Sequence, residues 1–340
     1  MQNKVLGCLG IGVAVALVIS LMANVFLFLG VLGSSMDPIA AAPPSFQEQL
    51  EAKGDPGVDQ KIVHIDLEGL ITGMSGSAFG GSMVETTKRA LAQAKADGKV
   101  AGVVLRINSP GGEVTASDTL YHAVQELAAK KPVIVFMDSI AASGGYYIAC
   151  GATKIMAAET TITGSIGVMM AAPNYKDLMD KIGLDMMVFK SGAFKDTLRG
   201  SREMRDDERA YIQSQVDEMY AKFVGIVADA RALPLEDLRG GLADGRIFSG
   251  AAAAENGLID GTGYLEDAYE LARQEAGVPG AKVVRYRMVP SLAGILRMLG
   301  EAPAGGAATT TKLELDLGIG GLMADLEPGC AYLLPGYLLP

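Results

Sequence analysis

Two residues of this chain, Ser143 and Lys195, stand in segments that suit hydrolytic chemistry. Ser143 lies in the run AASGGY at 141–146, where small neighbours let another backbone approach closely, and Lys195 follows the run KSGAF at 190–194. A serine hydroxyl becomes a nucleophile when a base takes its proton, and a lysine can be that base if burial strips its own proton. The pair therefore predicts amide hydrolysis without a histidine.

Donors for a developing oxyanion are predicted in two places. The run NSPGG at 108–112 follows an apolar strand pattern. Its proline restricts the turn and its glycines allow unusual backbone angles, so a bare N–H can point at an oxyanion. Gly144 follows Ser143 at a strand-to-helix passage, where the first helical N–H groups lack partners. Each run alone also fits an ordinary turn or cap, and the combination is what favours chemistry.

The residues themselves leave the identity of the base open. Lys190 and Lys195 both flank the Ser-Gly pair at 191–192. The ordinary lysine pKa is about 10.4 and full burial lowers it by up to about 3–5 units, so activity should rise with pH well below that value. The chain has two histidines, His64 in a predicted strand and His122 in a predicted helix. We expect both to be structural, since neither belongs to a recognisable triad motif.

Strand-like runs alternate with helical patterns along the middle of the chain. This alternation predicts an α/β fold with mostly parallel strands. Within 206–230 apolar residues recur at spacings of three and four, which predicts one buried stripe. The predicted strands are 61–67, 102–107, 133–136, 154–157 and 186–189, and the predicted helices are 84–96, 116–129, 145–149, 175–181, 206–230, 251–256 and 265–276.

The amino-terminal region predicts a membrane anchor. Residues 5–36 carry no charge, and the apolar run at 6–32 would form a helix of about 40 Å, longer than the roughly 30 Å hydrocarbon core of a bilayer. A cleaved signal peptide is the alternative, but its apolar region spans only about 7–15 residues. Lys4 precedes the run and acidic residues follow it. We therefore expect residues 1–4 in the cytoplasm, one pass through the cell (inner) membrane over 5–33, and the remainder outside the cytoplasm.

Three further segments follow the anchor. Residues 34–60, rich in Pro, Ala, Gly and acidic residues, are expected to form a stalk, and 61–280 the folded peptidase domain. Residues 281–340 are a C-terminal extension whose composition predicts partial flexibility. Its apolar end is expected either to visit the substrate groove as a self-inhibitory or self-processed segment, as a high local concentration would favour, or to pack on the domain or on a neighbour.

Composition argues against several other classes of function. The net charge of −10 does not suit a nucleic-acid partner, which would call for a basic stripe. The three cysteines and two histidines have no metal-ligand spacing, so we expect no metal, no other cofactor and no disulfide framework. Cys150, in an apolar helix, is expected to be a buried small residue.

Five motifs, taken in order, resemble the signal peptide peptidase family of SppA type in its short, single-domain form. They are NSPGG at 108–112, AASGGYY at 141–147, TITGSIG at 161–167, SGAFKD at 191–196 and ADGRIF at 243–248. The resemblance spans residues 61–277. It implies a Clp protease/crotonase-like α/β fold of stacked β-β-α units, with an N-terminal transmembrane helix.

The resemblance also implies a role for each candidate residue. The motif lysine precedes an aspartate, which selects Lys195 over Lys190. A related Clp protease has a histidine some way after its serine, whereas residues 161–170 here contain none. The implied roles are the nucleophile for Ser143, the general base for Lys195, a lysine-orienting hydroxyl for Ser165, and oxyanion N–H donors for Gly112 and Gly144.

The expected function is a membrane-anchored serine endopeptidase with a Ser-Lys dyad, which degrades signal peptide remnants and other apolar unfolded segments. Its expected partners are those peptides, the membrane and further copies of the chain, in a ring such as an octamer whose serine and lysine come from adjoining copies. One alternative is a membrane-bound Clp-like Ser-Lys protease that acts with stomatin-type partners. A non-proteolytic crotonase-fold protein is the other, and the presence of both Ser143 and Lys195 counts against it.

Overall fold

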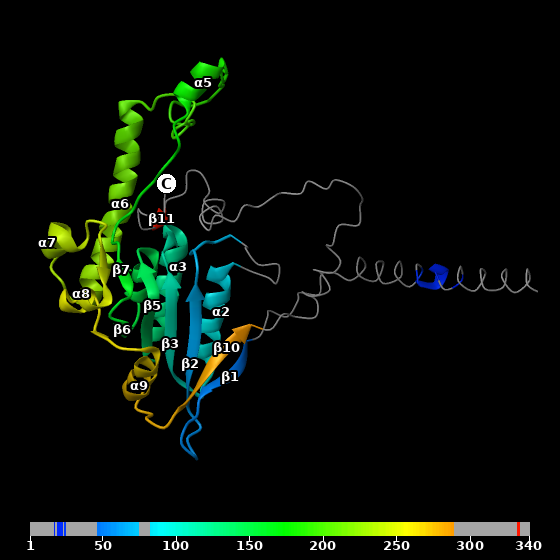
Figure 1. Ribbon diagram of the computed structural model, residues 1–340, viewed down its shortest axis with the longest axis vertical. Coiled ribbons are helices and arrows are strands. Elements are labelled where there is room, and N and C mark those ends of the chain that lie inside the picture. The colour runs from blue at the N-terminus through cyan, green and yellow to red at the C-terminus, as the bar shows by residue number, and fades with distance from the viewer. Residues whose placement is uncertain are drawn as a thin grey trace, which may run out of the picture.

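The structure, a computed structural model, describes residues 17, 19–22, 24, 46–74, 82–288 and 332–333. One sheet with helices on both faces forms a mixed α/β fold, from which a long helix projects (Figure 1). Within the described residues no helix has the length and apolar character needed to cross a bilayer. Most of the predicted anchor at 5–33 lies outside the described residues.

The centre of the sheet consists of parallel strands that the sequence predicted. They are apolar and buried on both faces, as parallel strands covered by helices should be. Four of the five predicted strands are confirmed: β2 (Lys61–Glu68), β3 (Val100–Ser109), β5 (Val133–Ala142) and β6 (Lys154–Ala157). The main path runs β1-β10-β2-β3-β5-β6-β9, with β1 (Phe46–Ala52), β10 (Lys282–Met288) and β9 (Gly261–Thr262), while β7 (Ile162–Gly164) pairs with β5 and with β8 (Ile247–Ser249).

All seven predicted helices are present, with ends that differ by one or two residues. They are α2 (Met83–Ala96), α3 (Val114–Ala128), α4 (Gly144–Ala149), α5 (Lys176–Ile182), α6 (Asp206–Arg231), α8 (Gly250–Glu255) and α9 (Leu265–Glu275). A short helix that the pattern did not predict, α7 (Leu235–Asp237), leads into a π-helical turn at Leu238–Leu242. Helices α2 and α3 cover one face of the sheet and α9 covers the other.

The sheet includes one strand that precedes the predicted peptidase domain in the sequence and one that follows it. β1 falls in the predicted stalk and β10 in the predicted C-terminal extension, and the two pair antiparallel from Phe46 opposite Met288. β10 also runs parallel to β2, with Lys282 opposite Lys61. The polar sequence FQEQLEA did not predict the strand β1, because an edge strand buries little surface and keeps polar side chains.

The fifth predicted strand, at 186–189, is wrong. These residues have no regular structure, and the Phe189 side chain is 94% exposed. A short apolar run resembles a buried strand by composition alone. Here the run belongs to an arm, residues 170–205, that connects the sheet to the far end of α6 and includes α5 (Figure 1).

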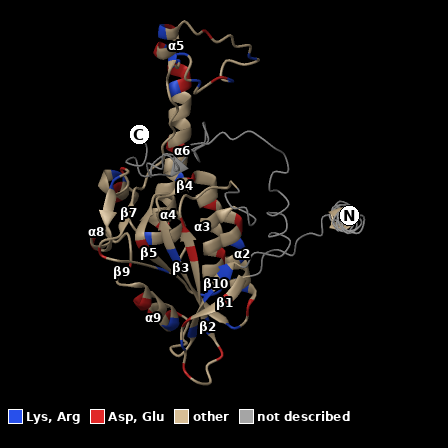
Figure 2. Ribbon diagram, turned by 45° about the vertical axis from the view of Figure 1, so that its right-hand side comes forward, with Lys and Arg blue, Asp and Glu red and all other residues tan. Residues whose placement is uncertain are grey.

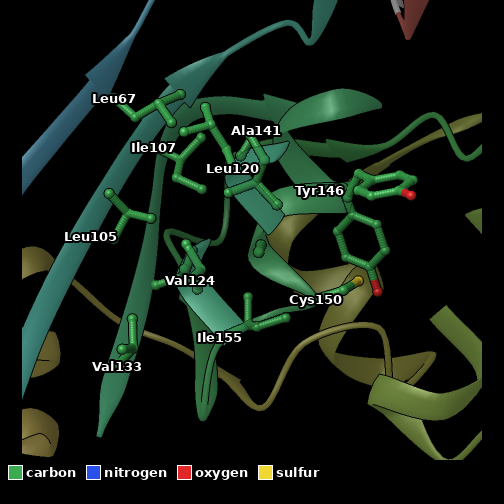
Figure 3. Packing of buried hydrophobic residues seen from close by; sticks show 14 of the residues in the cluster. Leu67, Leu105, Ile107, Leu120, Val124, Val133, Ala141, Tyr146, Cys150 and Ile155 are labelled. Atoms are coloured by element: carbon green, nitrogen blue, oxygen red, sulfur yellow. The ribbon is translucent and has the colours of Figure 1, made fainter. Parts of the chain in front are cut away.

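Helix α4, which follows the candidate serine, is anchored in the main core. Figure 3 shows Tyr146 and Cys150 packed among the apolar side chains of the sheet and α3. The Tyr146 hydroxyl donates to the carbonyl of Leu258 at 2.7 Å. Cys150 is buried, as predicted, and burial raises the pKa of its thiol to about 12. The turn before α4 is therefore built on a rigid support.

Helix α6 fully buries apolar side chains only in its carboxyl-terminal half. Phe223 and Val227 of the predicted stripe are fully buried. Three residues of the stripe nearer the amino end are only half-buried: Ile212, Val216 and Met219. The apolar stripe continues where the helix has left the domain, so its outer half is available for another surface.

His64 is structural, as expected. Its ring nitrogens lie 2.7 Å from the Tyr269 hydroxyl and 3.0 Å from the Asp66 carboxylate. Arg285 of β10 donates two further hydrogen bonds to that carboxylate, at 2.7 and 2.8 Å. Burial by itself would raise the pKa of Asp66, but its hydrogen bonds with His64 and Arg285 outweigh burial and hold the pKa well below its usual range.

Replacing Asp66 with asparagine is expected to lower the free energy of unfolding at pH 7 by about 2–4 kcal/mol. A carboxyl whose pKa is lower in the folded chain stabilises the fold above its unfolded pKa of about 3.9, and this contribution is lost as pH falls further. Urea unfolding should therefore show the two proteins converging below pH 4. Asp59→Asn, at an exposed carboxylate 3.9 Å from Lys99, is the control and should change stability by less than about 0.5 kcal/mol. An equal difference at pH 3 and pH 7 would contradict the prediction.

Candidate active site

Ser143 lies at the sharp turn where β5 passes into α4. Its φ of 53° and ψ of −112° are rare for a residue with a side chain. Its N–H donates to the carbonyl of Gly164, and its own carbonyl accepts from the N–H of Tyr147, both at 2.8 Å. A strained strand-to-helix turn of this kind holds the nucleophile of hydrolases above the end of a sheet.

The Ser143 hydroxyl is buried and has no hydrogen-bond partner among the described residues. Leaving such a group unpaired costs about 1–3 kcal/mol. Buried polar groups are otherwise almost always paired, so an unpaired one calls for an explanation. A hydroxyl kept free for a partner that enters from outside the described chain supplies that explanation.

Three parallel strands, β3, β5 and β7, end at the same edge of the sheet. Their register pairs Ser109 with Ala141, and Ala141 with Thr163. The segments that leave these strands are therefore neighbours. This edge brings together four of the predicted site residues: Gly112, Ser143, Gly144 and Ser165.

The two predicted oxyanion donors lie side by side. Gly112 begins the short strand β4 (Gly112–Glu113), which pairs with Ile71. The carbonyl of Gly111, just before β4, accepts from the N–H of Ile71, and the N–H of Glu113 donates to the carbonyl of Ile71, both at 2.8 Å. Because successive residues of a strand face opposite ways, Gly112 turns its own N–H away from Ile71. A Cβ atom added to Gly144 would lie only 3.2 Å from the nitrogen of Gly112. The main chains of Gly112 and Gly144 thus lie next to each other at the serine turn.

Glu113, which none of the five sequence motifs includes, braces this loop. Its carboxylate accepts from the Thr72 hydroxyl at 2.5 Å and from the N–H of Gly73 at 3.2 Å. Residues 71–73 are therefore joined to β4 by both main-chain and side-chain hydrogen bonds. Thr72 and Glu113 are 41 positions apart, and no local pattern marks such a pair.

Ser165 lies beside a cavity of about 410 Å³. Only 4% of Ser165 is exposed, its φ is 50°, and its N–H donates to the carbonyl of Arg246 at 2.8 Å. The cavity is lined by residues 165–169, by the loop 243–245 and by side chains of α6 that include Tyr220. A side chain from a substrate or from another copy of the chain could enter here.

Part of the sequence is similar to proteins that are named as proteases. Residues 125–279 match the profile of peptidase family S49. The chain is 42% identical over 191 residues to "Putative protease MJ0651" of Methanocaldococcus jannaschii, which is 56% of this chain and 61% of that protein. It is 37% identical over 236 residues to "Putative signal peptide peptidase SppA" of Enterococcus faecium, which is 67% of each chain. The chain belongs to peptidase family S49.

As a member of that family the chain is an SppA-like serine protease. Among solved structures it resembles a ClpP1 mutant from Listeria monocytogenes, with a TM-score of 0.42 and 16% identity over 61% of this chain and 94% of that one. Structural similarity at this level does not identify catalytic residues. The mixed α/β fold follows from the strand order itself, and the stacking of β-β-α units stays a prediction.

In this S49 protease Lys195 lies on the arm, far along α6 from the serine turn. It is exposed, and Arg205 at the start of α6 donates to the carbonyl of nearby Ala193 at 3.1 Å. The serine's helix, α4, contacts the opposite half of α6, where the rings of Tyr147 and Phe223 are 4.8 Å apart.

The length of α6 separates the two candidate catalytic residues within one chain. Phe223 is 18 positions along the chain from Arg205, which corresponds to about 27 Å of helix at 1.5 Å per residue. A lysine side chain cannot span that distance. The structure therefore brings the predicted nucleophile and the predicted oxyanion donors together in one chain but does not bring that chain's own Lys195 to them.

Lys190, the other candidate base, is already paired. Its ammonium group lies 2.7 Å from the Asp196 carboxylate and donates to the carbonyl of Ala193 at 3.2 Å. The Lys195 amine enters no such ion pair or hydrogen bond within the described part of the chain. This difference favours Lys195 over Lys190 as the candidate general base.

Gly112→Ala is expected to lower kcat at least about 100-fold, the scale for losing one oxyanion donor. A Cβ at this position would lie 1.9 Å from the carbonyl oxygen of Ile71, so the loop must move and carry the N–H with it. Steady-state hydrolysis of a peptide amide measures the effect. Gly98→Ala is the matched control, because nothing lies within 4 Å of its added Cβ and it should behave as wild type. Normal kcat in the Gly112 variant would remove Gly112 from the oxyanion site.

Proposed function

We propose that this chain is a membrane-anchored serine endopeptidase that degrades signal peptide remnants and other apolar unfolded segments. In the proposal Ser143 is the nucleophile, and Lys195 of a neighbouring copy is the general base. The uncharged run at 5–36 supports placement in the cell membrane with the peptidase domain outside the cytoplasm.

The strained serine turn carries the proposal. Ser143 combines a rare backbone conformation, an unpaired buried hydroxyl and two adjacent glycine N–H groups. Strain and an unsatisfied hydroxyl each destabilise the fold, and they occur together where a nucleophile must be presented. An ordinary helix cap would require neither.

The chemistry follows from these positions. Neutral Lys195 takes the proton of Ser143 as Oγ attacks the peptide carbonyl, and the N–H groups of Gly112 and Gly144 stabilise the oxyanion. Protonated Lys195 then donates its proton to the leaving amine. Water resolves the acyl-enzyme with the same lysine as base. The Ser165 hydroxyl would orient Lys195 in the site assembled from two copies.

Features of the arm support a base that comes from a neighbouring copy. The arm exposes large apolar side chains, among them Met187 at 84% and Phe189 at 94%. Cavities of about 410 and 330 Å³ lie along α6, next to its half-buried stripe. Contiguous exposed apolar surface marks protein interfaces, and a head-to-tail contact of this kind can close into a ring.

The substrate would bind as an extended strand at β4. One edge of β4 is occupied by Ile71, and the other pairs antiparallel with β11 (Tyr332–Leu333) in the C-terminal extension. Main-chain pairing of this kind binds peptides with little demand on sequence and holds the scissile bond beside Gly112. Apolar unfolded segments suit such a site because they are free to extend.

A fluorophosphonate probe tests the proposed nucleophile. The wild-type protein should be labelled covalently at one site, and mass spectrometry should place the label on Ser143. Ser143→Ala should remain unlabelled, while the surface control Ser214→Ala should be labelled like the wild type. Undiminished labelling of Ser143→Ala would overturn the proposal.

Truncation after Gly300 is expected to raise the rate on a short peptide substrate several-fold. In the structure Tyr332 pairs with Glu113, and Leu333 with Gly112, where the proposed substrate strand would lie. A tethered segment competes at high effective concentration, so its removal should free the groove.

Leu333→Pro in the full-length chain should give a similar rise, since proline removes an N–H from the pairing. If the tail is also processed, the purified wild-type chain should be lighter than Ser143→Ala. Equal rates in all forms, together with equal masses apart from the deletion, would show that the tail packs elsewhere.

A further inference from the structure

The turn that carries Lys195 is braced by ion pairs that the proposed chemistry does not use. Arg202 is at their centre. Its guanidinium donates to both carboxylate oxygens of Asp196, at 2.9 and 3.0 Å, and to both of Glu208, at 2.6 and 2.8 Å. The residue next to Lys195 is thereby tied to α6. Figure 2 shows charged residues of both signs around α5 and this end of α6.

Glu208 anchors these ion pairs to the helix. Its side chain is fully buried, and its carboxylate accepts from the N–H of Arg205 at 3.0 Å, which caps the first turn of α6. The Asp196 side chain is only 9% exposed. Isolated surface ion pairs contribute little, but these carboxylates are largely shielded and are held by a guanidinium with fixed geometry.

Lys190 braces the other flank of the same turn. Its ammonium group lies 2.7 Å from Asp196 and also donates to the carbonyl of Ala193. Arg205 donates to that same carbonyl at 3.1 Å. The backbone on both sides of Lys195 is therefore held, while no described residue pairs with its amine.

The ion pairs that Arg202 makes with Asp196 and Glu208 persist at neutral and alkaline pH, because a guanidinium stays protonated there. Hydrogen bonds from Arg202 and Lys190 hold the pKa of Asp196 well below its usual range. Hydrogen bonds from Arg202 lower the pKa of Glu208 to about 2. Only strong acid would discharge either carboxylate, so both stay ionised and bound to Arg202 at neutral and alkaline pH.

We propose that Arg202 is a positioning residue: by joining Asp196 to Glu208 it fixes the Lys195 turn on the rigid end of α6 and presents the amine in one orientation to Ser143 of the neighbouring copy. This inference rests on the proposed role of Lys195 as the base. A general base must come within hydrogen-bond reach of the proton it removes. Misplacing a reacting group by about 1 Å costs about 100-fold in rate.

Steady-state kinetics of the full-length, assembled protein on a peptide amide tests the role of Arg202. Arg202→Met is expected to lower kcat about 100-fold and to leave KM within about two-fold, because the serine, the oxyanion donors and β4 are untouched. Arg202→Lys keeps the charge but cannot bridge two carboxylates, so kcat should fall about 10-fold. The matched control is Arg199→Met on the same turn. Its guanidinium contacts the Ser201 hydroxyl at 2.9 Å and the Met186 sulfur, and it binds no carboxylate of a described residue, so this variant should retain wild-type kcat.

A double variant separates positioning from general damage. In the Lys195→Ala background, adding Arg202→Met should leave the residual hydrolysis of an activated ester unchanged, since no base remains to be positioned. A further fall in that background would show a merely structural role. Light scattering reports whether Arg202→Met stays assembled. If it does not, the same two comparisons are made with Arg202→Lys, alone and combined with Lys195→Ala.

Two other outcomes separate the positioning role of Arg202 from the proposed role of Lys195 as the base. Wild-type kcat and KM in Arg202→Lys and Arg202→Met, with Lys195→Ala inactive, would overturn the positioning role and leave the proposed function intact. Near-wild-type activity of Lys195→Ala would refute the base itself, and the positioning role with it.

Discussion

Ser143→Ala is expected to abolish peptide hydrolysis, with kcat at least about 10⁴-fold lower than in the wild type, while the fold remains intact. The substitution removes only a hydroxyl that is buried and has no hydrogen-bond partner among the described residues. Loss of an unsatisfied group does not destabilise, so the urea midpoint should stay the same or rise slightly. A protein that loses activity together with stability would point to a structural serine instead.

Lys195→Ala should be as inactive as Ser143→Ala, and the double variant no worse, because the nucleophile and its base act as one unit. Lys190→Ala is the comparison on the same turn. Lys190 braces the turn through Asp196 rather than acting on substrate, so its loss should be much milder. If Lys190→Ala is the inactive variant and Lys195→Ala is not, the motif assignment is displaced by one lysine.

Mixing the two inactive proteins is expected to restore activity, and this is the second large effect. In a head-to-tail ring assembled from equal amounts of Ser143→Ala and Lys195→Ala subunits, about a quarter of the sites would pair an intact serine with an intact lysine. The physical basis is the separation along α6, which keeps Lys195 from the serine turn of its own chain. Activity of the mixture after unfolding and joint refolding measures this directly.

Two controls decide how the mixture is interpreted. Each variant refolded alone should stay inactive, and the double variant mixed with wild type should lower activity rather than restore it. A mixture as inactive as its components would place both residues of a working site in one chain. That chain's arm would then have to fold back by a large movement of α6.

Much of the active-site edge was predictable because its signals are local. Glycine and proline in NSPGG restrict one turn, and small residues on either side of Ser143 mark a strand that passes directly into a helix. The central strands were predictable from continuous apolar runs, and the helices from a period of three to four. These features depend on neighbours only a few positions away.

Other elements escaped the sequence for the opposite reason. β1 is polar because it lies at an edge, and the apolar run at 186–189 is exposed because it lies on the arm. Burial, which separates these cases, is a property of the folded chain and not of composition. The Thr72–Glu113 pair and the Arg202–Glu208 pair are likewise contacts that no periodicity marks.

The sequence by itself determined the kind of chemistry and the residues of the serine turn, since backbone conformation there follows from residue type within a few positions. Only the tertiary structure decided that Gly112 and Ser165 meet the Ser143 turn at one sheet edge, because strand register joins segments far apart in the chain. It also decided that Lys190 is paired and that Lys195 stands on a distant arm. The direction in which α6 leaves the domain fixes that distance, and no local pattern encodes it.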